Sequence, residues 1–114
     1  MTSIITLNIK SDMPTVDEAR RRLLTELHRA KARGVKAIKL IHGYGSTGVG
    51  GKLGDALRSS LSRRRKEGLI QSWVAGEKWD PFDPVAQGIL EACPELGRDV
   101  DVGQGNPGVT IVLL

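Results

Sequence analysis

Apolar residues recur along this chain with two periods, and each period predicts one kind of secondary structure. Segments in which apolar residues alternate with polar ones, or follow one another, predict strands over residues 4–10, 35–41, 69–75 and 109–114. Segments in which apolar residues lie three or four positions apart predict helices over residues 16–33, 53–65 and 85–92. Strands and helices therefore alternate, and the short third helix precedes the last strand.

Residues at the predicted helix ends support these limits. Thr15 and Glu18 form a predicted capping box at the start of the first helix. The Thr15 hydroxyl can accept from the Glu18 backbone N–H, and the Glu18 carboxylate can accept from the Thr15 backbone N–H. Gly34 suits the position just beyond the end of the same helix. Asp83 followed by Pro84 is typical of a cap and first residue of a helix, so the third helix is expected to begin there.

This order of elements predicts an α/β or α+β fold with a mixed four-stranded sheet. Two main helices for four strands favour a two-layer sandwich over a doubly wound fold, in a single domain spanning residues 1–114. Residues 35–41 are almost continuously apolar, which predicts a central strand covered on both sides or nearly so. Residues 94–107 show little periodicity and are expected to form a loop.

The net charge of +4 hides an uneven distribution. Residues 15–68 contain fourteen Lys or Arg and five Asp or Glu, whereas residues 69–114 contain two and seven. Two interpretations stay open at this point. The cations lie on solvated helix faces, or they form a footprint for a phosphate backbone. Asp99 and Asp101 in the acidic third are expected only to be solvated.

Other features exclude several classes of protein. A single cysteine, Cys93, allows no intramolecular disulfide, and two histidines fourteen residues apart argue against a zinc cluster. A serine nucleophile elbow is absent. Because no secretory leader or membrane-spanning segment is visible, we expect a cytoplasmic protein with no membrane partner. We also expect it to act as a monomer or weak homodimer.

Residues 41–52 form a glycine-rich segment between a predicted strand and a predicted helix. Backbone N–H groups in such a loop can bind an anion at the helix N-terminus, and the surrounding basic residues favour a phosphate. Its helix begins too late for a dinucleotide site, and Lys52 is followed by Leu53 rather than by the hydroxyl of a P-loop. We therefore expect a phosphate-binding loop of another kind.

Particular side chains are candidates for this chemistry. His42 is either a catalytic acid or base, or a structural residue whose ring bonds a nearby carbonyl. Tyr44 is a candidate for stacking on a base. Trp79 and Phe82 are expected to pin the loop over residues 76–84 to the body of the protein. The predicted nucleic-acid-binding residues are Lys10, Gly43, Tyr44, Gly45, Ser46, Thr47, Gly48, Lys52 and Arg58.

Three segments in order resemble motifs of the small MutS-related (Smr) domain family, in its compact stand-alone bacterial form. His42-Gly43-Tyr44-Gly45 resembles the family's H-G-x-G motif, and Thr15 to Ala19 resembles the second half of its first motif. Gly108 to Val112 resembles its last strand. The resemblance covers nearly the whole chain. It implies a sandwich similar to the C-terminal domain of translation initiation factor three, and DNA or RNA binding, with nicking endonuclease activity in some members.

The chain departs from the family in the first half of the first motif. Where the family carries Asp and His, this sequence has Asn8 and Lys10, so a carboxylate for acid–base or metal chemistry is missing. We therefore expect nucleic-acid binding with weak or lost endonuclease activity. If the chain cleaves, His42 is the acid–base candidate, and water or hydroxide on a divalent metal would be the nucleophile; otherwise no cofactor is implied. The alternatives are a protein–protein adaptor and a binder of small phosphates.

Overall fold

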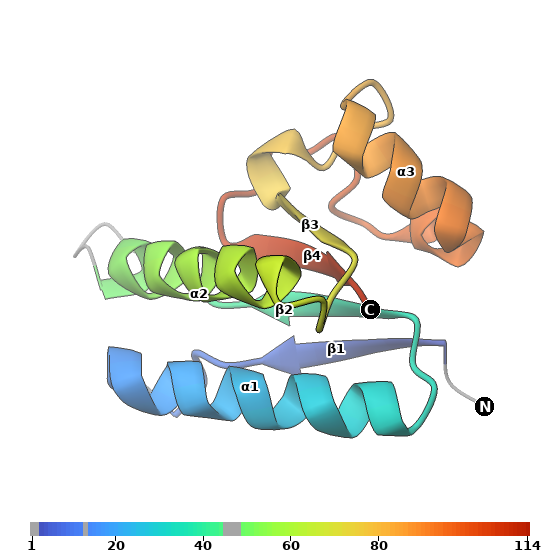
Figure 1. The fold of residues 1–114 in the computed structure, drawn as a ribbon. Helices are drawn as coiled ribbons and strands as arrows, with labels where there is room; N and C mark the ends of the chain where they lie inside the picture. The colour runs from blue at the N-terminus through green and yellow to red at the C-terminus, as the bar shows by residue number, and fades with distance from the viewer. Residues whose placement is uncertain (1–2, 13, 45–48) are drawn as a thin grey trace.

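The computed structural model describes residues 3–12, 14–44 and 49–114, and a mixed four-stranded sheet lies at its centre (Figure 1). The strands are β1 (Ile4–Asn8), β2 (Ala37–Ile41), β3 (Ser72–Ala75) and β4 (Val109–Leu113), in the order β1-β2-β4-β3. β1 runs parallel to β2, and β4 runs antiparallel to both of its neighbours. The predicted mixed sheet is therefore confirmed, with the apolar β2 in a central position.

Two long helices cover one face of this sheet. α1 (Val16–Ala32) and α2 (Val49–Lys66) pack side by side. Together with Ile38, Leu40 and Val112 of the sheet they enclose the larger hydrophobic core. α2 begins at residue 49 rather than at 53, because the glycines of its first turn carry no apolar signal for sequence analysis to detect.

A third helix covers part of the opposite face. α3 (Pro84–Ala92) and two 3-10 turns, η1 (Gly76–Lys78) and η2 (Pro94–Arg98), enclose a smaller core with Ala37, Ile111 and Leu113 (Figure 1). Residues of one strand thus alternate between two cores, as the period of two requires. The predicted pair of main helices on a sheet is confirmed, and α3 adds a partial layer behind it.

Thr15 and Asp83 cap the N-termini of α1 and α3, as predicted. The Thr15 hydroxyl accepts a hydrogen bond from the Glu18 backbone N–H at 3.2 Å. The Asp83 carboxylate accepts from two backbone N–H groups in the first turn of α3. No helix of the described residues combines the length and the apolar character that crossing a membrane requires.

Two expectations about side chains were wrong. Phe82 is 88% exposed and pins nothing, whereas Trp79 is fully buried as predicted and donates from Nε1 to Asp99 at 3.1 Å. Asp99 and Asp101 are not simply solvated, since both bind the ammonium of Lys39, and one of these contacts measures 2.7 Å. Sequence analysis could not find this cluster because Lys39 lies sixty residues before its partner.

Candidate functional site

The segment that follows β2 is held against the start of β4. The backbone N–H groups of His42 and Gly43 both donate to the Gly108 carbonyl, at 3.1 and 3.0 Å. Gly43 has a φ of 77°, in the left-handed region that favours glycine. The chain therefore turns sharply at this point and leads toward the N-terminus of α2.

The His42 ring is buried, with 1% of its surface exposed, and both of its nitrogens have partners. Nδ1 lies 3.0 Å from the Gly43 carbonyl, and Nε2 lies 2.9 Å from the Thr110 hydroxyl. Because a carbonyl only accepts, Nδ1 carries the proton and Nε2 accepts from Thr110. Burial lowers the pKa of His42, and the nearby Arg58 adds to this effect, so the ring is neutral at neutral pH.

Arg58 connects this histidine to the loop that precedes β4. Its Nε donates to the Thr110 hydroxyl at 3.0 Å, and its two terminal nitrogens form a pair of hydrogen bonds with the Glu77 carboxylate. One of these nitrogens also donates to the carbonyls of Pro107 and Val109. Every nitrogen of Arg58 therefore has a partner inside the protein. Burial alone would raise the pKa of Glu77, but its hydrogen bonds with Arg58 and with its own backbone, together with the charge of Arg58, outweigh burial and lower it.

These contacts bear on the predicted roles of His42 and Arg58. A general base at His42 would have to give up the Thr110 hydroxyl, and a phosphate at Arg58 would have to displace Glu77. The prediction that His42 is catalytic stays untested, and the geometry favours a role in positioning the loop. The prediction that Arg58 contacts nucleic acid also stays untested, and its hydrogen bonds within the protein favour a structural role.

A cleft of about 480 Å³ opens at the N-terminus of α2. Tyr44 is 68% exposed at its edge, and Lys52 projects from the first turns of the helix. The cations Lys52 and Arg58 are matched in this cleft by the carboxylates of Asp55 and Glu77. The cleft is therefore polar but not strongly positive.

The remaining predicted residues lie around the turn at Gly43. Lys10 packs its stem over Gly43, since a Cβ at that glycine would lie 3.0 Å from the Lys10 Cδ. Asn8 accepts a hydrogen bond from the Lys10 backbone N–H and so holds the turn after β1. The segment from Gly45 to Gly48, with Ser46 and Thr47, lies outside the described residues. Lys10 of the first-motif segment and Gly43 are thus neighbours in space.

Sequence analysis missed a second polar site on the outer surface of the helices. A groove of about 140 Å³ is lined by Arg20 of α1 and by Ser59, Ser60 and Arg63 of α2. Arg63 lies three and four positions after the two serines, so all three share one face of α2. That spacing was the only signal available, because the facing Arg20 comes from a different helix.

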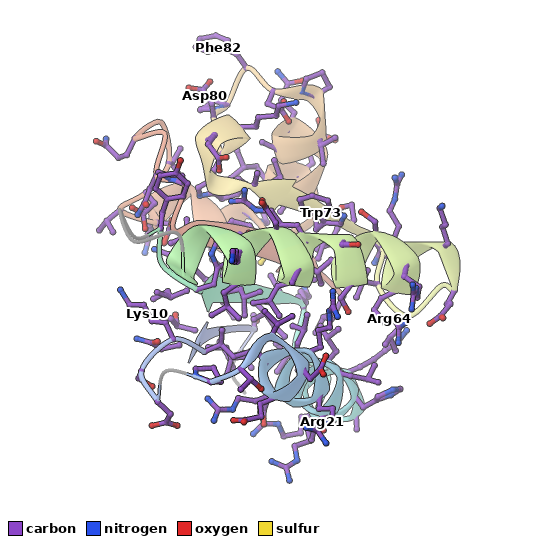
Figure 2. All side chains as sticks on the ribbon, turned by 90° about the vertical axis from the view of Figure 1, so that its left-hand side faces the viewer. Lys10, Arg21, Arg64, Trp73, Asp80 and Phe82 are labelled. Carbon is purple, nitrogen blue, oxygen red and sulfur yellow. The ribbon has the colours of Figure 1, made fainter. Side chains whose placement is uncertain are left out.

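Several cations of the two long helices have no acidic partner. Among the described residues, no carboxylate lies within salt-bridge distance of the exposed cations Arg21, Lys31, Lys52, Arg63, Arg65 and Lys66. Figure 2 shows Arg64 on the side of α2 that faces α1, where its carboxylate partner Glu67 lies at 3.3 Å. The described part of the chain brings together no three His, Cys, Asp or Glu side chains suited to a metal ion.

Comparisons with known proteins agree with this architecture. The family model of the Smr domain matches residues 12–79. The crystal structure of the Smr domain of Thermus thermophilus MutS2 is 25% identical in sequence, with a TM-score of 0.57. The match covers 99% of this chain and 98% of that one. A search of curated proteins found no match.

Proposed function

This chain belongs to the Smr domain family, and from that premise we propose that it binds DNA or RNA through the phosphate backbone. The observation that carries the proposal is the excess of cations on the two long helices. α2 alone contains six Lys or Arg and one Asp, and α1 packs beside it on the same face of the sheet. Such a field attracts a polyanion at long range.

The groove between the helices is the first of the proposed phosphate contacts. Two guanidinium groups from different helices face one opening, and two serine hydroxyls supply further donors. Arg20 forms only a weak ion pair with Asp17, because the two groups lie 3.6 Å apart and both side chains are exposed to solvent. A phosphate oxygen in this groove would therefore meet more positive charge than in the cleft at the start of α2.

The cleft would add contacts of a different kind. Lys52 has no carboxylate partner among the described residues and can pair with a phosphate, while Tyr44 presents an exposed ring for stacking. Lys10 and the glycine loop from Gly43 to Gly48 remain part of the proposed surface. His42 and Arg58 lie beneath this surface, and both form hydrogen bonds with the Thr110 hydroxyl.

We further propose that binding occurs with little or no cleavage. Hydrolysis of a phosphodiester needs a group that orients or deprotonates water. Asn8 cannot ionise, and the lone pair of His42 is already engaged by the Thr110 hydroxyl, so neither side chain is free to act as a general base. Nicking of supercoiled plasmid by the purified protein should therefore be low or absent.

The proposal is tested by removing matched charges from two places. We expect Arg20→Ala with Arg63→Ala to weaken binding of a labelled oligonucleotide about tenfold or more, measured by fluorescence anisotropy. Lys36→Ala with Arg98→Ala removes the same charge away from the groove and should have a smaller effect. Equal losses of affinity in the two double variants would show that binding depends on net charge and not on the groove. No binding of any nucleic acid by the wild type would favour the adaptor alternative.

A further inference from the structure

A third groove lies along α2, on the side away from α1. It has a volume of about 520 Å³ and is lined by Ser62, Arg65 and Lys66 of α2 and by Trp73 of β3. Figure 2 shows Trp73 on one side of α2 and Arg64 on the other. β3 is an edge strand, so this groove is open at the border of the sheet.

Trp73 is held firmly but is not fully covered. It pairs with Val112 of β4 and packs against the core beneath α1 and α2, while part of its ring lines the groove. The other tryptophan, Trp79, is completely buried in the core on the far face of the sheet. Trp73 is therefore the tryptophan that a ligand can reach.

The two cations of the groove are available for a ligand as well. Arg65 lines the groove and donates from Nε to the Gln71 carbonyl at 3.3 Å, and among the described residues its two terminal nitrogens have no hydrogen-bond partner. Lys66 is exposed at the last position of the helix. Among the described residues, neither has a carboxylate within salt-bridge distance.

We propose that this groove binds an unpaired nucleotide of a DNA or RNA strand, with the Trp73 ring stacked on the base and Arg65 and Lys66 paired with its phosphates. An indole beside two cations matches both halves of a nucleotide, the planar base and the charged backbone. An acidic peptide would satisfy only the cations. This inference rests on the proposed function, and it adds a preference for single strands, because the bases of a duplex are already stacked on one another.

Tryptophan fluorescence measures this contact directly, because the protein contains two tryptophans, of which Trp73 lines this groove and Trp79 is completely buried. We expect oligothymidylate and oligouridylate to quench the emission in a saturable way. A blunt duplex of the same length, and polyglutamate, should quench it far less. Comparing the two single strands distinguishes DNA from RNA as the preferred ligand.

Substitutions at Trp73 separate stacking from simple apolar contact. Trp73→Leu should weaken single-strand binding about tenfold and abolish the quenching, whereas Trp73→Phe keeps a ring and should restore most of the affinity. Both should bind duplex as the wild type does. The emission of Trp79 reports in each variant whether the core on the far face is intact. Arg65→Ala with Lys66→Ala keeps the tryptophan and should weaken binding and quenching together.

Two results would overturn the inference. One is equal quenching by polyglutamate and oligothymidylate, and the other is equal single-strand affinity in Trp73→Leu and the wild type. If binding still depends on Arg20 and Arg63 in that case, the proposed function stands and only this groove is wrongly assigned. If no nucleic acid binds even at low salt, both proposals fail.

Discussion

His42 and Gly54 are packed so closely that the glycine is required. A Cβ at Gly54 would lie 2.9 Å from both Cε1 and Nδ1 of the His42 ring, which is fixed by two hydrogen bonds. We expect Gly54→Ala to reduce the free energy of unfolding by about 1–3 kcal/mol, because the ring has no room to move. Urea denaturation monitored by circular dichroism measures this change.

Gly88 provides the matched control in another helix. Nothing lies within 4 Å of a Cβ placed there, so Gly88→Ala should stabilise the protein by up to about 1 kcal/mol through helix propensity alone. If Gly54→Ala were also stabilising, His42 would not be held where the structure places it.

The buried histidine also makes stability depend on pH. Burial lowers its pKa in the folded state, so the unfolded chain binds the proton more readily. Its contribution is complete above the unfolded pKa of about 6.5 and is lost as the pH falls through that value toward the folded pKa. Between about pH 7 and pH 5, wild-type protein should therefore lose more stability than His42→Gln. Equal losses in the two proteins would show that His42 does not titrate abnormally.

At the scale of the elements, β2 is attached to the segment after η2 by a buried ion cluster. Lys39 binds Asp99 and Asp101, and all three side chains are mostly buried. Burial alone would lower the pKa of Lys39, but its hydrogen bonds to Asp101 and Asp99, together with the negative charges of both carboxylates, outweigh burial and raise it. The ammonium therefore stays charged throughout the neutral range.

Removing Lys39 would leave two buried carboxylates without their cation. We expect Lys39→Met to lower the free energy of unfolding by about 3–5 kcal/mol. Lys36→Met, at an exposed position just before β2, should change it by less than about 0.5 kcal/mol. Thermal melts of the two variants give the comparison, and similar melting temperatures would mean that the cluster contributes nothing.

What the sequence could predict at this scale was local. Thr15 and Asp83 cap helices through bonds to residues two or three positions away, so their patterns are visible in the sequence. The packing of α3 on the opposite face from α1 was not predictable, because an amphipathic pattern gives the apolar side of a helix but not its partner. The carboxylate partners of Lys39 were not predictable either, because they lie about sixty positions away in the sequence.

Within the candidate site, sequence reasoning found the segment but not the roles. The position of His42 after a strand and before a helix was predictable from periodicity. Its engagement by Thr110 was not, because the two residues are 68 positions apart. Lys52 and Tyr44 are exposed, and their role in binding stays a prediction, whereas Arg58 is engaged by Glu77.

At the scale of the whole molecule, the charge asymmetry of the sequence becomes an arrangement of surfaces. The basic residues 15–68 include both long helices on one face, and the acidic residues 69–114 include α3 on the other. Among the described residues, at least three grooves or clefts border α2, and each is lined by at least one arginine. We therefore propose that nucleic acid binds along α2.

The salt dependence of nucleic-acid affinity in the wild-type protein tests this claim most directly. Anisotropy titrations of labelled single-stranded and duplex DNA and RNA over a range of KCl concentrations give the slope of log affinity against log salt. With four or five phosphates neutralised along α2, we predict a linear fall with a slope of about −3 to −5. Affinity that does not change with salt, or no binding of any of these nucleic acids at the lowest salt, would contradict the proposal that nucleic acid binds along α2.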